Sequence, residues 1–404
     1  MGKYSPRSAP TQLRKSDSLQ ITMSDNALSN HPVVSLTEAL IACDSTNPEL
    51  VEGGAGEGAV AELIAARLRR AGLQTELEQV RPGRPNVIAR LPGSGGGRTL
   101  MLCGHSDVVG ADAEGFRPRI EAGRLYGRGA VDMKGGLAAA IIAAERIAAG
   151  PKLAGDLVVA AVIDEEWQSL GAEALVARHG ADGAILAEQS DLDLIVEHGG
   201  FAWFELTTSG PEAAGIEPER GIDLIAQLGP ILTGIANLDQ ELAGRAAPAY
   251  GRPSIHASMV ASGTFYPSYP TSCVLGIERC LVGGESVAGA RAEIDTLLAA
   301  ARAADPRFDA QVKMIVGREA VQLDTSGPLV KALEAEITSY RGTAPKHIGD
   351  IGWADSGLLV EAGVPCVIFG PTGGGFHTAD EYVTLDSLVA SAEIIEAAAR
   401  RFCA

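Results

Sequence analysis

Short apolar runs that alternate with helical segments constrain the fold of this chain more than any other feature of its sequence. The runs include "TLMLC", "LVVAAVI", "AILA" and "PCVIF", and each is followed by polar residues or glycine. Segments between them, such as "GEGAVAELIAARLRRAGLQ" and "MKGGLAAAIIAAERIAA", place apolar residues at helical spacing. Short apolar strands separated by helices are typical of a mostly parallel sheet covered on both faces. The sequence therefore predicts an α/β fold with a mostly parallel sheet flanked by helices.

A glycine-rich stretch, "GSGGG" at 93–97, lies between two predicted strands in "NVIARLPGSGGGRTLMLCGH". Glycine tolerates the backbone conformations that tight turns require. We therefore interpret this stretch as the turn of a β-hairpin.

The region from residue 201 to 317 has a different order of elements. A strand, a helix, two strands, a helix and a strand follow one another, which is the β-α-β-β-α-β order of ferredoxin-like domains. The α/β pattern resumes after it with "SGPLVKALEAEITSYRG". We therefore predict an inserted ferredoxin-like α+β domain at 201–317, within a catalytic domain made of residues 32–200 and 318–404. Residues 1–31 are polar, lack the apolar core of a signal peptide and are predicted to form a flexible N-terminal tail.

Charge and cysteine content narrow the choice of partner and compartment. The formal net charge of −18 argues against nucleic acid or an anionic membrane as the main partner. No apolar run approaches the ~18 residues of a membrane span. The six cysteines form no C-x-x-C pair, and scattered thiols of this kind are typical of a reducing compartment. The sequence therefore predicts a cytoplasmic protein that acts on a small molecule.

Histidines and carboxylates follow the apolar runs, where each predicted strand ends. The carboxyl ends of parallel strands meet at one edge of an open sheet, and active sites form there. We therefore expect side chains that are far apart in sequence to converge on one crevice. A single histidine at a strand end is more often structural, and a pair of acidic residues is usually part of a solvated turn. The indication of a site therefore comes from several such residues at one edge of the sheet. The converging residues are His105, Asp107, Asp132, Glu165, Glu166, Glu188 and His377.

Imidazole and carboxylate without thiolate favour Zn²⁺, Co²⁺ or Mn²⁺ as ligand partners. A carboxylate can bridge two such ions about 3.5–4 Å apart, as in many hydrolases. Positions two apart in an extended segment face the same side, so Asp107 is expected to hold the far nitrogen of His105. Glu165 and Glu166 are neighbours and should diverge: one can bind metal while the other takes a proton from metal-bound water. The spacing alone leaves open which glutamate does which.

Several longer stretches resemble a known family. They are "GHSDVV", "GRLYGRGAVDMKGGLAA", "IDEEWQSLGAEAL", "LAEQSD" and "GPTGGGFHTADEYV". They resemble the dinuclear zinc metallopeptidases and amidohydrolases that include acetylornithine deacetylase, succinyl-diaminopimelate desuccinylase, aminoacylase and the glutamate carboxypeptidases. The resemblance runs from about residue 34 to the C-terminus. Over this region the sequence most resembles the acetylornithine deacetylase-like branch of the family.

The resemblance implies a role for each converging residue. Glu165 would be the general base, and Asp107 would support His105, so these two belong to the catalytic machinery. Two divalent ions would be the cofactors, with Zn²⁺ expected first and Co²⁺ or Mn²⁺ as alternatives. The implied ligands are His105 and Glu188 for one ion, Glu166 and His377 for the other, and Asp132 as the bridge between them.

The resemblance also implies the architecture and the reaction. The catalytic domain would have a zinc exopeptidase-like fold, and the inserted domain would be a lid through which many relatives form a homodimer. Water held by the metals would attack the acyl carbonyl of a linear amide, and Glu165 would carry its proton to the leaving nitrogen.

The lid and the segment that leads into it depart from the family pattern at three positions. Ala214, in "GPEAAGIEP", stands where many relatives have a histidine, Gly199 replaces a basic residue, and Cys280 replaces an arginine. The remaining candidates for substrate contacts are His256, Arg279 and Asp355.

These departures leave the substrate class open. The first hypothesis is an amidohydrolase for N-acyl amino acids or related small amides. The second is a relative that acts on a neutral or aromatic amide, urea or carbamate, because the polar contacts of the lid are depleted. The third is a non-catalytic metal-binding relative, against which Glu165 argues, since a binding protein needs no base.

Overall fold

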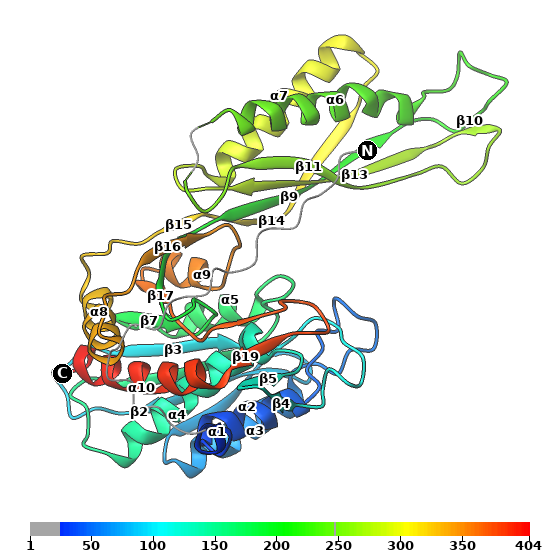
Figure 1. Cartoon of the computed structure of the whole chain (residues 1–404). Coiled ribbons are helices and arrows are strands. Elements are labelled where there is room, and N and C mark those ends of the chain that lie inside the picture. The colour runs from blue at the N-terminus through cyan, green and yellow to red at the C-terminus, as the bar shows by residue number, and fades with distance from the viewer. Residues whose placement is uncertain (1–24, 246–247) are drawn as a thin grey trace.

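The computed structural model describes residues 25–245 and 248–404, which form two layered domains joined side by side (Figure 1). Residues 1–24 of the predicted tail lie outside the described residues. The rest of that segment differs from the prediction, because Asp25–Ser29 form helix α1, which contacts the C-terminal helix. No described helix combines the length and the apolar character that a membrane crossing requires.

The large domain is built on a mixed sheet to which nine of the described strands belong, and the prediction of a mostly parallel α/β sheet is confirmed. Its central strands β6, β3, β7 and β17 run parallel, and antiparallel pairs extend both edges. Their residues are almost all buried because helices cover both faces. The strand order is β1 (Gln74–Arg81), β2 (Arg84–Leu91), β6 (Leu157–Val162), β3 (Leu100–His105), β7 (Gly183–Leu186), β17 (Cys366–Ile368), β8 (Leu194–His198) and β15 (Val321–Gln322), with β16 (His347–Asp350) also paired to β8.

Helices α4 and α10 pack on one side of this sheet, and α5 and α9 lie on the side that faces the smaller domain (Figure 1). Small residues of α4 allow close packing: the Cβ that Gly136 lacks would lie 1.6 Å from the carbonyl oxygen of Ala187. The helices of this domain are α2 (Pro32–Ala42), α3 (Gly58–Arg70), α4 (Gly135–Ala149), α5 (Leu170–Arg178), α8 (Pro328–Arg341), α9 (Ser356–Glu361) and α10 (Leu385–Phe402).

The prediction of a hairpin at 93–97 is wrong. Strands β2 and β3 are not neighbours, because β6 lies between them and pairs with both. The glycine-rich stretch instead packs against the segment that leads into β6: Ser94 N–H donates to Leu153 O, and a Cβ on Gly93 would lie 2.3 Å from Gly155 O. Gly93 and Gly97 allow close backbone approach, and Gly95 and Gly96 have positive φ values of 101° and 90°, which glycine adopts readily.

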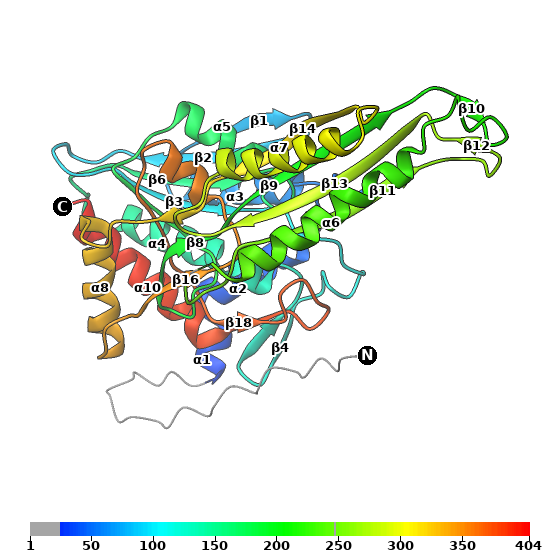
Figure 2. The same ribbon diagram turned by 90° about the horizontal axis from the view of Figure 1, so that it is seen from above.

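A second, antiparallel sheet forms a separate domain, as the β-α-β-β-α-β order predicts. Its strand order is β11-β13-β9-β14, and helices α6 and α7 cover one of its faces (Figures 1 and 2). This domain has its own apolar core. The exact domain boundaries stay a prediction. The elements are β9 (Gly200–Ser209), α6 (Leu224–Ala243), β11 (Ser254–Ser262), β13 (Ser272–Leu281), α7 (Val287–Ala304) and β14 (Ala310–Arg318).

Two small sheets complete the structure. Strands β10 (Ala213–Ala214) and β12 (Ser268–Tyr269) pair at the far tip of the small domain (Figures 1 and 2). In the large domain, β18 (Gly373–Gly374) and β19 (Tyr382–Thr384) pair with each other, and β19 continues onto β5 (Arg124–Tyr126) and β4 (Arg119–Glu121). This sheet joins the loop of His377 to the segment that leads to Asp132.

Candidate metal centre

The histidines and carboxylates singled out in the sequence meet beyond the carboxyl ends of the central strands. His105 is the last residue of β3, Glu165 and Glu166 follow β6, and Glu188 follows β7. His377 lies in the loop between β18 and β19, and Asp132 lies in the segment Ala130–Lys134 before α4, where its own backbone is not helical. Parallel strands end at a common edge, so this convergence follows from the sheet topology.

Asp132 stands at the centre of the cluster. Its Oδ1 lies 3.2 Å from Nε2 of His105, and its Oδ2 lies 2.8 Å from Nε2 of His377. Glu188 Oε1 lies 3.2 Å from Nε2 of His105, and Glu166 Oε2 lies 3.3 Å from Nε2 of His377. The side chains thus form two groups that could each hold a metal ion, His105–Asp132–Glu188 and Asp132–Glu166–His377, and both include Asp132.

Glu165 belongs to neither group. Its Oε2 lies 3.8 Å from Nε2 of His105, which leaves the carboxylate beside the two groups rather than within them. Burial, together with the neighbouring carboxylates of Asp355, Glu188 and Glu166, raises the pKa of Glu165 well above its usual range. The position of this carboxylate, beside the ligand groups rather than within them, suits a proton acceptor.

The electrostatics of the cluster fit divalent cations. Burial raises the pKa of Glu188, and burial plus the charge of Asp132 raise the pKa of Glu166 to about 7. Hydrogen bonds to Asp132 and Glu166 in turn raise the pKa of His377 to about 10. Carboxylates crowded in a buried space repel one another unless positive charge compensates them. Two divalent cations would supply that positive charge. Imidazole nitrogens and carboxylate oxygens are donors that bind zinc, cobalt and manganese.

Asp107 does more than the sequence pattern suggests. The Nδ1 of His105 lies 3.0 Å from the main-chain oxygen of Asp107 and 3.5 Å from its Oδ1, so the backbone carbonyl is the nearer partner. The carboxylate of Asp107 accepts from the backbone N–H groups of Glu165 and Glu166, each at 3.2 Å. Asp107 therefore ties the end of β3 to the glutamate pair and fixes both sides of the cluster.

A buried network behind Asp107 was missed by the sequence reasoning. Asn47 Nδ2 donates to Asp107 at 2.8 Å and to Asp164 at 3.1 Å, and Arg84 Nη2 donates to Asp164 at 2.9 Å. Glu57 pairs with the same guanidinium at 2.7 Å. Asp164 follows an apolar run just as Glu165 does, so its strand-end position was a usable signal, whereas Asn47 and Arg84 lie in segments without any pattern that points to the site.

Glu381 was also missed, and it holds the segment that carries Asp132. Its fully buried carboxylate accepts from the backbone N–H groups of Gly129, Val131 and Asp132 at 3.0–3.1 Å, and from Arg128 at 2.6 Å.

We expect Glu381→Gln to weaken metal binding by about 10–100-fold, the usual effect of losing an outer partner of a ligand. The amide places a donor where the backbone donors need an acceptor, so Asp132 loses its fixed position. Isothermal titration with Zn²⁺ measures the change. Glu145→Gln, which removes an ion pair with Arg67 outside the cluster, is the control and should bind Zn²⁺ normally. Equal affinity in both variants would contradict this role.

Two of the three predicted substrate contacts, His256 and Arg279, lie away from the cluster, whereas Asp355 is a buried neighbour of Glu165. His256 is half-exposed on β11, with Nε2 3.5 Å from Glu278. Arg279 is buried and paired with Glu285 and Glu293 at 2.7 and 2.9 Å, because the period of two along β13 turns it toward the helices. Asp355 is fully buried beside α9, and burial raises its pKa to about 7. None of the three is among the described residues that line the neighbouring cavity.

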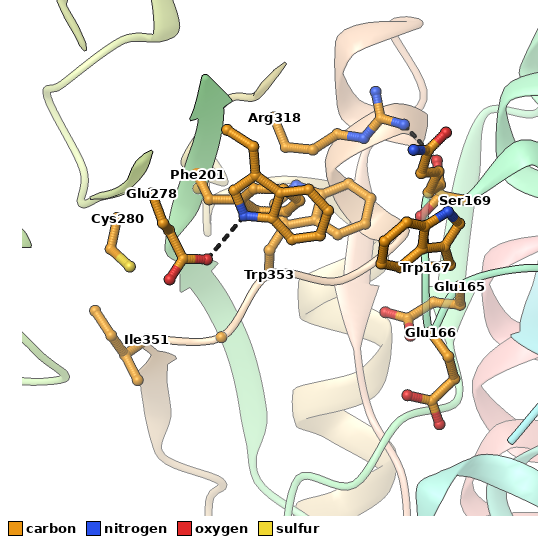
Figure 3. A pocket seen from close by; sticks show the side chains of 14 residues that line it. Glu165, Glu166, Trp167, Ser169, Phe201, Glu278, Cys280, Arg318, Ile351 and Trp353 are labelled. Atoms are coloured by element: carbon orange, nitrogen blue, oxygen red, sulfur yellow. Dashed lines mark hydrogen bonds between the residues drawn. The ribbon is translucent and has the colours of Figure 1, made fainter. Parts of the chain in front are cut away.

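That cavity, of about 300 Å³, opens beside Glu165 and Glu166 and reaches the small domain (Figure 3). A further group of possible ligands, Glu76, Glu78 and His179, lies elsewhere in the large domain. There Glu78 is already paired with Arg178 at 2.6 Å, so a structural ion pair accounts for it.

The fold and the paired ligand groups define a class: a metal-dependent hydrolase with an α/β catalytic domain and a separate antiparallel-sheet domain. Comparison with family models places the chain within that class, since residues 101–401 match the model of peptidase family M20/M25/M40. The chain belongs to this family and is a hydrolase of linear amide bonds.

Individual relatives agree with this assignment. The chain is 30% identical to N-formyl-4-amino-5-aminomethyl-2-methylpyrimidine deformylase of Bacillus subtilis (strain 168), over 82% of this chain and 86% of the relative. It is 28% identical to acetylornithine deacetylase of Myxococcus xanthus, over 84% of this chain and 90% of the relative. Among solved structures, a dinuclear metal-binding M20 peptidase of Bacillus subtilis shares the fold, with a TM-score of 0.65 and 17% identity over 91% of this chain and 96% of the other.

Proposed function

We propose that this chain hydrolyses the amide bond of a small molecule with a pair of divalent metal ions, Zn²⁺ first and Co²⁺ or Mn²⁺ as alternatives. The position of Asp132 carries the proposal, because its two carboxylate oxygens face the two histidines from opposite ends of one side chain. A carboxylate in this position suits a bridge between two ions. The proposed ligands are His105, Asp132, Glu166, Glu188 and His377.

Two ions bound there would lower the pKa of a water molecule and polarise the carbonyl oxygen of the substrate. Glu165 would take a proton from the attacking water and deliver it to the leaving nitrogen. The glutamate pair would thus divide the work: Glu165 moves the proton and Glu166 binds metal. Asp107 positions both glutamates through their backbone N–H groups. Its carboxylate therefore keeps the base at a fixed distance from His105.

The substrate is proposed to be a neutral amide rather than an N-acyl amino acid with a free carboxylate. Cys280 lines the cavity at the position where the family resemblance leads us to expect an arginine. The neighbouring Arg279 points to the opposite face of the sheet. Ala214 lies at the far tip of the small domain (Figure 1). Glu278 lines the cavity and would repel an anionic group, while Arg318, the cation in the same lining, is already paired with Glu173. The deformylase relative is named for a pyrimidine substrate, which fits an uncharged amide.

Assembly and compartment complete the proposal. The edge strand β11 exposes apolar side chains, with Met259 54% and Val260 63% exposed, and such an edge favours pairing with a second copy of the chain. We therefore propose a homodimer through the small domain, which sedimentation analysis would test. The six cysteines are free thiols, the form that the cytoplasm maintains.

A panel of N-acyl compounds tests the proposed function. Each compound is offered in two matched forms, with a free and with an amidated carboxylate, and each assay is run with and without added Zn²⁺ or Co²⁺. We expect metal-dependent turnover and higher kcat/KM for the amidated form. Turnover of no amide under any condition would contradict the enzyme proposal. A preference of tenfold or more for the free acid, ~1.4 kcal/mol of transition-state binding, would contradict the neutral-substrate proposal alone.

A further inference from the structure

All three tryptophans of the chain, Trp167, Trp203 and Trp353, line the cavity beside Glu165 and Glu166. They come from segments that are far apart in the sequence. Trp167 follows the glutamate pair, Trp203 lies on β9 of the small domain, and Trp353 precedes α9. Every tryptophan of the chain therefore lies at one cavity, next to the candidate base Glu165.

Phe201 joins the tryptophans to form a continuous aromatic wall. Its ring centroid lies 5.0 Å from that of Trp203 and 5.9 Å from that of Trp353, in an edge-on arrangement in the second case. Trp203 in turn lies 5.7 Å from Trp167. These spacings are those of interacting aromatic pairs. In Figure 3, Phe201 and Trp353 lie between Glu278 and Cys280 on one side and Trp167, Glu165 and Glu166 on the other.

The wall faces open space rather than a packed core. Alternate residues of β9 are buried against α6 and α7, whereas Phe201 and Trp203 point to the other face of the small sheet and are only partly buried. Trp167 and Trp353 are partly buried as well. Large apolar side chains that remain accessible beside a few polar groups are typical of ligand pockets, and about 300 Å³ accommodates one ring and its substituents.

The polar groups of the cavity are fixed in place. Glu278 accepts from the indole N–H of Trp203 at 2.8 Å. Arg318, the cation that lines the cavity, donates to Gln168 O at 2.6 Å and to Glu173 at 2.8 Å, and its guanidinium lies 5.5 Å from the ring centroid of Trp353. Glu173 already pairs with this cation, and the other charged side chains that line the cavity are the carboxylates of Glu165, Glu166 and Glu278. The lining therefore offers flat apolar surfaces and no unpaired cation for an anion.

We propose that the aromatic wall is a subsite for a planar, uncharged aromatic ring on the amide substrate. The ring stacks against the tryptophans and so brings the attached amide to Glu165 and the metal groups. This inference rests on the proposed function for the amide, but the subsite itself binds the ring without any reaction.

Tryptophan fluorescence tests the subsite directly, because every tryptophan of the chain lines it. The protein, freed of metal with a chelator, is titrated with N-acetylbenzylamine and with N-acetyl(cyclohexylmethyl)amine, which differ only in having a flat or a puckered ring. We expect the aromatic amide to change the emission and to bind at least about fivefold more tightly, as stacking on several rings predicts. Equal affinity for the two amides would overturn the subsite.

Variants separate binding from catalysis in the metal-loaded enzyme. Trp203→Leu should raise KM for the aromatic amide by about tenfold, leave kcat nearly unchanged and have little effect on the cyclohexyl amide. Trp203→Phe should restore most of the loss, because it keeps a flat ring. Tyr340→Leu, which removes a half-exposed aromatic ring from α8, is the matched control. Equal losses for both amides in Trp203→Leu would overturn the inference.

The two proposals fail in different ways. Tight binding of the aromatic amide, together with no turnover of any amide in the panel with or without added metal, leaves the subsite standing and contradicts the proposed function. Hydrolysis of both amides with equal kcat/KM, and equal affinity in the fluorescence titration, contradicts the subsite and leaves the amidohydrolase standing.

Discussion

Glu165→Gln is expected to slow turnover by about 10²–10⁴-fold while the chain keeps its two metal ions. General acid–base catalysis is worth that much in other enzymes. A glutamine amide cannot accept the proton that we propose Glu165 takes, and Glu165 lies outside both ligand groups. Metal content by elemental analysis and kcat on an amide from the panel measure the two effects separately.

Glu166→Gln is the matched comparison, since it makes the same change one residue away. Glu166 Oε2 lies 3.3 Å from His377 Nε2, within the second ligand group. We therefore expect lower metal occupancy as well as lower activity. If Glu165→Gln lost metal and Glu166→Gln kept it, the roles of the two glutamates would be exchanged.

Among the variants considered, Asp132→Asn is expected to lower the metal content most, because both ligand groups include this residue. An amide offers one neutral oxygen where the carboxylate offers two charged ones, so neither ion keeps a full set of donors. Metal ions stabilise the transition state of such reactions by several kcal/mol, and about 4 kcal/mol corresponds to a ~10³-fold loss of rate. We expect fewer than about one ion per chain and a loss of kcat of at least that size.

Two controls accompany this variant. Asp156→Asn removes a half-exposed aspartate that pairs with Arg90 at 2.8 Å outside the cluster, and it should retain metal and activity. The unchanged protein, treated with a chelator, should lose activity and regain it on addition of Zn²⁺ or Co²⁺. Full activity in metal-free protein would contradict the two-metal proposal.

Most residues of the cluster could be named from the sequence because they follow an apolar run, and Asp132 because it precedes a helix. Short apolar strands in an α/β pattern end at one edge of the sheet, so His105, Glu166 and Glu188 had to be neighbours in space. The ferredoxin-like order of the inserted segment was equally visible, since alternation with a period of two and helical spacing are local properties of the chain.

Contacts between distant segments were not visible in this way. The prediction of a hairpin at 93–97 was wrong because β6, which comes later in the sequence, lies between β2 and β3 in the sheet. The buried network of Asn47, Arg84 and Asp164 joins three segments that share no sequence pattern. Local periodicity says which face of a strand a side chain occupies but not which segment lies against that face.

The sequence alone therefore determined the kinds of elements, their order and the set of side chains at the strand ends, because these follow from local spacing. Only the tertiary structure decided which atoms meet: the two oxygens of Asp132 between two histidines, the carboxylate of Asp107 on the backbone of the glutamate pair, and the tryptophans of both domains around one cavity. The physical reason is that such contacts depend on the order of strands in the sheet and on how the two domains pack against each other. The local spacing of apolar residues carries no information about either.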